Sequence, residues 1–254
     1  MAADTFRLSF AAPAWAQTAR AGQFVNIQMP QHGDLLWRRP FSVHDADSAH
    51  GTLDILFAAV GRGSRALSRC KPGDALDVLG LLGNSFTEPA EEEEVILVAG
   101  GLGVAPFMLL LRQLRHWPGK KTVFLGFRSS RQVCCAETLV QRGARIVLSS
   151  DDGSAGVRGL VTTALEDYLI SRDARQKVLL YVCGPTPMLR SVRAVALQYH
   201  IPAQVTVENR MACGFGACVG CPVELAQPRP DGQKYLLACK DGPVFPLEEI
   251  VFND

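Results

Sequence analysis

The chain has 254 residues, with 26 basic and 25 acidic side chains and a formal net charge of +1. Its apolar fraction of 48% and charged fraction of 20% are those of an ordinary globular protein, which excludes intrinsic disorder as its main character. The near-zero net charge gives no electrostatic reason to expect nucleic acid or an anionic membrane as a partner. The length allows one large domain or two to three small ones.

The first residues do not read as a secretion signal, because no basic segment is followed by an apolar core. We therefore expect a cytoplasmic protein. In that compartment disulfides are rare, so clustered cysteines hold a metal or act in redox chemistry. Eight cysteines are present, and their placement must decide what they do.

Residues 1–88 have the pattern of a small antiparallel β-barrel. Short runs at 23–29 and 52–57 alternate in the manner of half-buried strands, and Gly and Pro are frequent. The one helix expected here is short and follows Gly63. The acidic run at 88–94 is interpreted as a solvated linker after this first domain.

The segment 89–207 alternates strands and helices and is predicted to form an α/β domain with a parallel sheet. The predicted elements are strands at 95–99, 122–127, 145–149, 178–182 and 204–207 and helices at 106–116 and 187–199. Residues 95–111 carry no charge and reach the lower limit of a membrane span. Three glycines and a proline interrupt them, so a buried strand, a glycine turn and a buried helix are expected instead, and no membrane partner.

The remaining residues, 208–254, are rich in Cys and Gly, and a piece this small needs a staple such as a metal. Cys213, Cys218 and Cys221 have the spacing of a plant-type [2Fe–2S] loop, and Cys239 follows after 17 residues. Four thiolates must converge on two irons, and the interleaved glycines let backbone N–H groups approach the sulfurs. The pattern favours iron–sulfur over zinc, because zinc sites usually use two short pairs. A structural zinc site and metal-free core cysteines stay open as alternatives.

Three further cysteines are expected to be ordinary packing residues: Cys70, Cys134 and Cys135.

Two glycine-containing turns follow predicted parallel strands. Gly100, Gly101 and Gly103 stand between a strand and a helix N-terminus, where exposed N–H groups favour a pyrophosphate. Cys183 and Gly184 follow a later strand. Because ligands of parallel sheets bind at the carboxyl ends of strands, the two turns together predict a dinucleotide site. An ordinary tight turn, and a buried structural role for Cys183, are the alternatives.

Asp151 and Asp152 follow the predicted strand at 145–149. Carboxylates there accept hydrogen bonds from ribose hydroxyls and repel a 2′-phosphate, which favours NAD over NADP. A plain surface turn is the alternative. Arg128 and Arg131 weaken the inference, because arginine can hold that phosphate.

The sequence Arg39-Pro-Phe-Ser is predicted to end a strand of the barrel, and Gly63 and Ser64 to open the short helix. Arg39 can pair with a phosphate, Phe41 can stack on a flat ring, and Ser42 can hydrogen-bond to it. Gly63 and Ser64 can offer N–H groups and a hydroxyl to a diphosphate. A solvated arginine pair and a helix cap are the alternatives.

These motifs, in their order along essentially the whole chain, resemble the ferredoxin-reductase superfamily. They are R-P-F-S, G-x-G-S-x-x-L-S, L-G-x-x-G-N-S-F, G-G-x-G-V-A-P, D-D-G-S, C-G-P-x-P-M and M-A-C-G-x-G-A-C-x-x-C. Within it, the chain looks like the electron-transfer subunits of type B dihydroorotate dehydrogenases, most specifically in C-K-D-G-P-V-F at 239–245. The resemblance implies an FAD-binding β-barrel over 1–88, an NAD-binding α/β domain over 89–207 and a [2Fe–2S] domain over 208–254.

The resemblance also implies roles for particular residues. The implied FAD contacts are Arg39, Pro40, Phe41, Ser42, Leu56, Phe57, Ala58, Gly63 and Ser64. The implied cluster ligands are Cys213, Cys218, Cys221 and Cys239. Phe41 stands where broader reductases often have tyrosine, so the stacking is kept and the hydroxyl contact is lost. No residue is expected to be catalytic in its own right.

The implied function is electron transfer within an NAD+-dependent dihydroorotate dehydrogenase of pyrimidine biosynthesis. A separate catalytic subunit containing FMN is expected to oxidise dihydroorotate, in a heterotetramer with two copies of each subunit. Electrons are expected to pass through the cluster to FAD and then, as a hydride, to NAD+, because a flavin converts between one- and two-electron chemistry. The alternatives are a reductase subunit of a hydrogenase, sulfite reductase or ferredoxin-dependent transhydrogenase, and, outside redox chemistry, a zinc-stabilised binding module.

Overall fold

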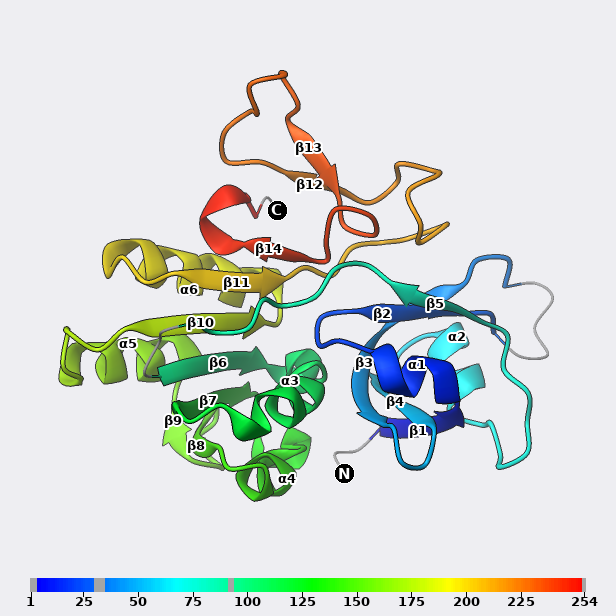
Figure 1. Cartoon of the computed structure of the whole chain (residues 1–254). Helices are drawn as coiled ribbons and strands as arrows, with labels where there is room; N and C mark the ends of the chain where they lie inside the picture. Colours follow the sequence, from blue (N-terminus) through cyan, green and yellow to red (C-terminus); the bar gives the residue numbers. More distant parts are fainter. Residues whose placement is uncertain (1–3, 30–34, 91–93, 253–254) are drawn as a thin grey trace.

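The computed structural model describes residues 4–29, 35–90 and 94–252, and within them the chain forms a barrel sheet, an α/β sheet and a small hairpin (Figure 1). The barrel strands are β1 (Thr5–Ala11), β2 (Phe24–Ile27), β3 (Arg39–Asp47), β4 (Thr52–Ala58) and β5 (Val78–Leu82). They pair antiparallel in the order β1-β4-β3-β2-β5. The predicted strands at 23–29 and 52–57 are therefore confirmed as β2 and β4.

Two short helices accompany the barrel. Helix α2 (Arg62–Leu67) is the predicted helix around Gly63. Helix α1 (Pro13–Thr18) is not predicted from the sequence, because it follows Ala12, which makes no side-chain cap hydrogen bond, and so it lacks a start signal such as the glycines and serine of α2.

The prediction that Arg39-Pro-Phe-Ser ends a strand is wrong, since these residues begin β3. Proline cannot donate to a ladder and is confined to strand starts and edges. Pro40 meets this condition because β2 alone pairs with this part of β3, and the β4 ladder begins at Val43.

The α/β sheet has the order β14-β11-β10-β6-β7-β8-β9, and its neighbours are parallel except for β14. Its strands are β6 (Glu94–Gly100), β7 (Lys120–Phe127), β8 (Arg145–Ser150), β9 (Val157–Arg158), β10 (Val178–Cys183), β11 (Ala203–Thr206) and β14 (Val244–Pro246). The α-helices are α3 (Phe107–Gln113), α4 (Ala136–Gln141), α5 (Val161–Ser171) and α6 (Thr186–Gln198). Short 3-10 turns complete the segment: η1 (Gly101–Val104), η2 (Leu114–His116), η3 (Ser130–Gln132) and η4 (Leu247–Glu249).

Helices cover both faces of this sheet, as the alternation along β6 requires. Val95 and Leu97 belong to the buried cluster that contains α3, whereas Ile96 and Val98 belong to the cluster that contains α5 and α6. Strands buried on both faces read as continuous apolar runs, as β6 and β10 do. Residues 95–111 form β6, η1 and most of α3, and among the described residues no helix is long and apolar enough to cross a membrane.

The interpretation of 88–94 as a solvated linker is wrong at its last residue; residues 91–93 lie outside the described part. Glu94 is 1% exposed and begins β6. Its carboxylate accepts hydrogen bonds from Thr122 at 2.5 Å and Tyr168 at 2.8 Å and pairs with Lys120 at 3.2 Å. A carboxylate is tolerated inside a protein when it is paired in this way.

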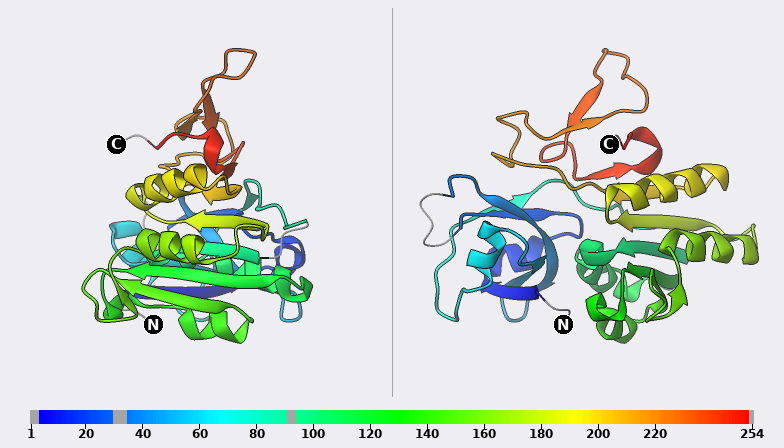
Figure 2. Two further views of the ribbon diagram at one scale, coloured as in Figure 1. Left: turned by 90° about the vertical axis from the view of Figure 1, so that its left-hand side faces the viewer. Right: turned by 180° about the vertical axis from the view of Figure 1, so that it is seen from behind.

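The cysteine-rich segment is joined to both larger sheets. Its hairpin of β12 (Pro222–Glu224) and β13 (Tyr235–Leu237) projects from the body of the molecule (Figure 2), and β14 then returns to pair with β11. Asn84, next to β5, donates to the carbonyls of Asp241 at 3.0 Å and Val244 at 2.8 Å. The small segment therefore gains stability by packing on its neighbours as well as from any metal it binds.

Candidate functional site

A cavity of about 390 Å³ opens between the barrel and the α/β sheet. Its wall consists of Phe24, Pro40, Phe41, Ser42, Leu56, Phe57, Ala58, Val60, Leu102, Ala105, Pro106, Cys183, Val207, Glu208, Asn209, Met211 and Pro243. Six of the nine predicted FAD contacts thus meet in one place, together with Cys183. The rings of Phe41 and Phe57 lie 5.4 Å apart on the barrel side. A mostly apolar slot with a few polar groups suits a flat, partly polar ring such as a flavin, and we call it the flavin cavity.

The other three predicted FAD contacts lie beside one another, off the wall of the flavin cavity. A Cβ placed on Gly63 would come within 3.5 Å of the Arg39 side chain. The Ser64 hydroxyl accepts a hydrogen bond from the backbone N–H of Gly61 at 3.0 Å, which closes the first turn of α2. The barrel therefore brings an arginine and a helix start together next to the cavity, an arrangement suited to a diphosphate.

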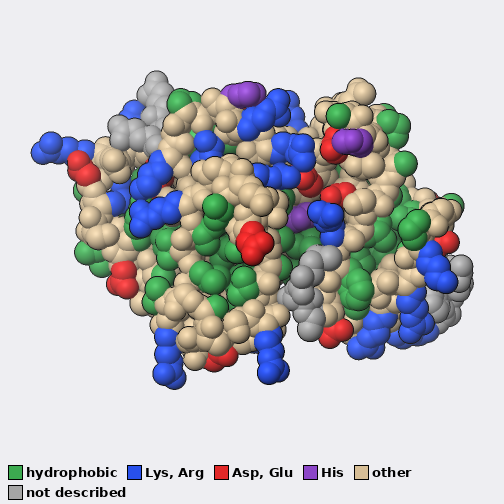
Figure 3. All heavy atoms as spheres, turned by 90° about the horizontal axis from the view of Figure 1, so that it is seen from below, with side chains coloured by type: hydrophobic (Ala, Val, Ile, Leu, Met, Phe, Trp, Pro, Cys, Tyr) green, Lys and Arg blue, Asp and Glu red, His purple; other side chains and the backbone are tan. Residues whose placement is uncertain are grey.

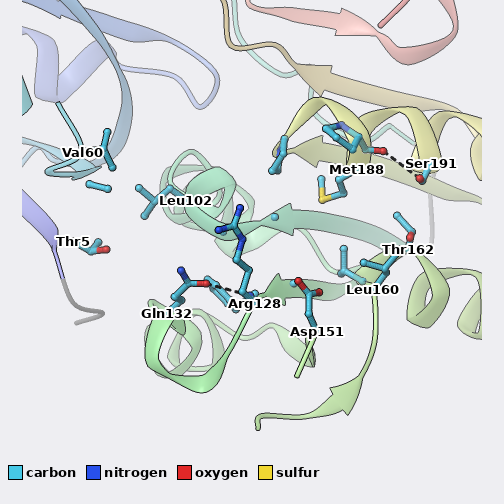
Figure 4. A pocket seen from close by; sticks show the side chains of 18 of the residues that line it. Thr5, Val60, Leu102, Arg128, Gln132, Asp151, Leu160, Thr162, Met188 and Ser191 are labelled. Atoms are coloured by element: carbon cyan, nitrogen blue, oxygen red, sulfur yellow. Dashed lines mark hydrogen bonds between the residues drawn. The ribbon is translucent and has the colours of Figure 1, made fainter. Parts of the chain in front are cut away.

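A second cavity, of about 630 Å³, lies at the carboxyl ends of the parallel strands (Figure 4). We call it the dinucleotide cavity. Three of the residues predicted to contact NAD line it: Gly100, Gly101 and Asp151. The two cavities share three wall residues, Ala58, Val60 and Leu102. A ligand in the dinucleotide cavity can therefore reach the flavin cavity without leaving the protein surface.

Gly103 and Gly184 pack next to the dinucleotide cavity without lining it. A Cβ on Gly103 would lie 2.1 Å from the carbonyl oxygen of Cys183, and one on Gly184 would lie 2.5 Å from the Met188 side chain. Both glycines are needed for the close packing of the two turns, and neither lines the cavity. The pair of turns recognised in the sequence is thus one packed unit.

Opposite charges face the dinucleotide cavity at the ends of β7 and β8. Arg128 and Asp151 both line it, and Figure 4 shows the two side chains on the same wall. Asp152 instead accepts hydrogen bonds from the hydroxyl and the backbone N–H of Ser154, at 2.6 and 2.9 Å. Of the two candidate aspartates, the structure places Asp151 alone on the cavity wall; Arg131 is also outside it.

Two titratable groups sit in the flavin cavity. Burial, and next the Glu208 carboxylate, raise the pKa of the Cys183 thiol to about 12, so Cys183 is a neutral side chain at physiological pH. Glu208 lines the cavity, and desolvation of its carboxyl by the surrounding protein raises its pKa. A neutral buried thiol is a poor nucleophile, consistent with a packing role for Cys183.

The four predicted cluster ligands are arranged as two pairs. The backbone N–H of Cys218 donates to the sulfur of Cys213 at 3.4 Å, and the sulfurs of Cys221 and Cys239 lie 3.3 Å apart. Among the described residues no group of three or more ligand side chains is arranged around a single metal ion. A binuclear cluster needs two thiolates for each iron, and the two pairs of cysteines supply that number.

The backbone of the cysteine loop also stabilises the thiolate form of Cys213. Burial acts to raise the pKa of Cys213, but the backbone N–H groups of Cys218, Phe215 and Ala217 overcome it and lower the pKa to about 6. The donors can approach because Gly214 has a φ of +82°, in the left-handed region. The donor set therefore suits thiolate ligation.

Known families match the chain in three consecutive parts. An oxidoreductase FAD-binding domain matches residues 1–86, an oxidoreductase NAD-binding domain matches 97–194, and the iron–sulfur cluster binding domain of dihydroorotate dehydrogenase B matches 208–251. A protein of Desulforamulus reducens is 36% identical over all of this chain and 95% of its own length. One of Shouchella clausii is 34% identical over 99% of this chain and 94% of its own length. Both are named dihydroorotate dehydrogenase B (NAD(+)), electron transfer subunit.

The chain belongs to this family. It carries FAD-binding, NAD-binding and iron–sulfur domains in that order, which confirms the predicted fold class, cofactors and oxidoreductase character. A solved structure of an NADH-dependent reduced ferredoxin–NADP oxidoreductase, described in connection with flavin-based electron bifurcation, matches 99% of this chain with a TM-score of 0.86 and 30% identity. An Amycolatopsis cytochrome P450 reductase, with a TM-score of 0.65 and 21% identity, shares the fold.

Several wall residues could not be recognised from sequence. In the flavin cavity these include Phe24, Val60, Leu102, Glu208 and Met211. Phe24 is the first residue of β2, Val60 lies in a loop, Leu102 lies in η1, and Glu208 and Met211 follow β11. Leu102 and Met211 stand inside recognised motifs, but their side chains carry no chemistry of their own. Their role follows from the way the barrel packs on the α/β sheet, which local patterns do not encode.

Proposed function

We propose that this chain is the electron-transfer subunit of an NAD+-dependent dihydroorotate dehydrogenase, working with a separate catalytic subunit that contains FMN. The names of the full-length relatives supply the reaction and the need for a partner. A heterotetramer with two copies of each subunit, located in the cytoplasm, is part of the proposal.

One observation carries the electron-transfer role. The flavin cavity adjoins both other sites: it shares Ala58, Val60 and Leu102 with the dinucleotide cavity, and its wall residue Met211 stands two residues before the predicted cluster ligand Cys213. A central position is what a converter between one-electron and hydride chemistry requires. Bound FAD would supply that conversion.

The chain's own residues have the following proposed roles. Phe41 and Ser42 hold the flat ring against the barrel, and Arg39 pairs with the diphosphate. The backbone of Gly100 and Gly101 approaches the pyrophosphate of NAD, and Asp151 accepts a hydrogen bond from its ribose. The four cluster cysteines are proposed to ligate the two irons as thiolates. Cys183 packs as a neutral thiol and helps to keep water out of the flavin cavity.

The test has two steps. The chain is purified without oxygen and titrated with NADH while visible absorption is recorded, and bleaching of flavin and cluster bands is expected. Addition of an FMN-containing catalytic subunit and dihydroorotate should then give NAD+ reduction that neither protein supports alone. Bleaching without dihydroorotate-dependent NAD+ reduction would remove the specific reaction and leave the general class. A colourless protein that contains zinc but neither flavin nor iron would instead favour the binding module.

The second candidate is the reductase subunit of a ferredoxin-dependent transhydrogenase. The observation in its favour is the match to the ferredoxin–NADP oxidoreductase structure over 99% of this chain. The two candidates share flavin, nicotinamide and cluster sites and differ in the partner. Co-purification from the host distinguishes them, because the transhydrogenase predicts recovery of a different large subunit and no dihydroorotate oxidation.

A further inference from the structure

One buried polar side chain has no part in the mechanism above. Asn26 lies on β2 and is 0% exposed, and its amide oxygen Oδ1 has no hydrogen-bond partner among the described residues. An unpaired buried acceptor costs on the order of 1–3 kcal/mol. An apolar residue of similar size avoids this cost, so the other end of the amide must account for the choice of asparagine.

The other end of the amide contacts the cysteine loop. Nδ2 of Asn26 donates to the backbone carbonyl of Cys213 at 3.1 Å. The approach is tight, because a Cβ on Gly214 would lie 2.4 Å from the same nitrogen. Gly214 also has a φ of +82°, which favours glycine. A barrel strand thus holds the first predicted cluster ligand through a side-chain hydrogen bond.

The same face of β2 belongs to the flavin cavity. Side chains two residues apart on a strand point to the same side, so Asn26 and Phe24 are neighbours on that face. Phe24 lines the flavin cavity. Across the ladder Asn26 is paired with Pro40, which lines the cavity as well. The contact between Asn26 and the cysteine loop therefore lies immediately beside the flavin wall.

We propose that Asn26 is a positioning residue that fixes the Cys213 end of the iron–sulfur loop against the flavin barrel and raises the reduction potential of the cluster. The inference rests on the proposed function, because it takes the four cysteines as cluster ligands. Hydrogen bonding around a cluster helps to set its potential. A reduced cluster carries one more negative charge than an oxidised one, and the positive end of the Asn26 N–H dipole, directed at the loop, favours the reduced form.

Two variants remove the donor in different ways. Asn26→Asp keeps the shape and cannot donate to a carbonyl as a carboxylate, and Asn26→Ala removes the group without adding charge. Gln28, the residue directly after β2, offers a matched control, because its Nε2 donates at 3.0 Å to the carbonyl of Leu35 and not to the cysteine loop. Gln28→Glu and Gln28→Ala therefore repeat the same chemical changes at an amide that holds no cysteine loop.

The readout is an anaerobic redox titration of the full-length chain with FAD and cluster bound, followed by electron paramagnetic resonance. We expect reduction of the cluster to become about tenfold less favourable in the Asn26 variants, a shift of about 59 mV to more negative potential for one electron. The g values of the reduced cluster should change, while the flavin content and the flavin potential stay at wild-type values. The Gln28 variants should match wild type in every measurement.

Each outcome bears on the proposal. An Asn26→Ala chain with a full cluster, wild-type potential and wild-type spectrum overturns it, and so does an equal shift in Gln28→Ala. Loss of the cluster from both Asn26 variants, with FAD retained and the Gln28 variants intact, supports the anchoring role. Loss of FAD together with the cluster overturns it, because Asn26 would then stabilise the barrel as a whole. None of these measurements uses dihydroorotate or a partner, so failure of the proposed reaction is recognised separately.

Discussion

Asp151 and Arg128 place opposite charges on one wall of the dinucleotide cavity, so we expect the choice between NAD and NADP to depend on these two residues. Replacement of Asp151 by alanine removes the acceptor for a ribose hydroxyl and leaves Arg128 free to attract a 2′-phosphate. A hydrogen bond to a charged group contributes about 1.5–3 kcal/mol. We therefore expect kcat/KM for NADH to fall by about tenfold or more and the preference to move toward NADPH. The assay is the NADH- or NADPH-dependent reduction of a dye that accepts electrons from the bound flavin. Asp152→Ala is the control, and an equal change in both variants would exclude Asp151 as the selecting residue.

Cys135 was expected from the sequence to be an ordinary packing residue, and its surroundings favour the thiolate form. It is half-buried beside Cys134, with a φ of +64°, and hydrogen bonding from Cys134, supported by His44, lowers its pKa against the opposing effect of burial. Cys70 is also half-buried, but burial raises its pKa. Because the thiolate is the nucleophile, Cys135 should be alkylated faster than Cys70 at pH 7. Timed iodoacetamide labelling of the FAD- and cluster-loaded protein with peptide mass spectrometry measures both rates, and similar rates would contradict the expectation.

At the scale of elements, the sequence predicted those strands and loops whose residues form a local pattern. The apolar runs of β6, β7, β8, β10 and β11 were recognisable, most clearly in β6 and β10, which are buried along almost their whole length. The cysteine spacing predicted the cluster loop. The start of β3 was placed wrongly, because the position of Pro40 depends on where the β4 ladder begins. The buried Glu94 was missed for a similar reason: its partners Thr122 and Tyr168 are 28 and 74 residues away in the chain.

The packing of η1 on the turn after β10 gives an element-scale prediction. A Cβ on Gly103 would lie 2.1 Å from a backbone oxygen of Cys183, and the backbone cannot move aside as a flexible side chain can. Gly103→Ala should therefore force the two turns apart and deform the dinucleotide cavity, with a destabilisation of about 1–3 kcal/mol from overpacking and a rise in the Kd for NADH. Gly61→Ala is the control, because nothing lies within 4 Å of its Cβ position. Calorimetry measures the Kd for NADH, and urea unfolding measures the stability of each variant. A Gly103→Ala protein with wild-type stability and wild-type NADH affinity would show that the turns are not tightly packed.

At the scale of the whole molecule, the barrel and the α/β segment are joined by a charged latch, which consists of Asp45, Arg112 and Arg142. Asp45, on β3, accepts hydrogen bonds from Arg112 on α3 at 2.8 and 2.9 Å and also pairs with Arg142, which follows α4. Beside it, the His44 ring hydrogen-bonds the carbonyl of Ala105 at 2.8 Å. On the face in Figure 3, Lys and Arg side chains lie in several separate places. The latch is thus a localised contact that helps to hold the two halves of the flavin cavity together.

The latch should make stability depend on pH in a defined direction. Burial acts to raise the pKa of Asp45, but hydrogen bonds from Arg112 and Arg142 outweigh it and lower the pKa from 3.8 to about 2. A depressed pKa means that the carboxylate stabilises the folded state above its unfolded pKa, and that this contribution is lost as the pH falls toward about 2. From the shift we expect Asp45→Asn to lose about 1–2 kcal/mol at pH 7, after allowance for solvent screening. The difference from wild type should shrink between pH 4 and pH 2.

Urea unfolding at pH 7 and near pH 3, followed by flavin fluorescence and circular dichroism, measures this difference. Asp47→Asn is the control, because Asp47 lies two residues further along β3 and pairs with the exposed His50 instead of the α/β segment. We also expect Asp45→Asn to release bound FAD at lower urea concentration than Asp47→Asn, since one wall of the flavin cavity comes from each side of the latch. A difference that stays constant with pH would show that Asp45 contributes through its shape and hydrogen bonds, with no contribution from its charge. Equal FAD release from the two variants would show that the cavity does not depend on the latch.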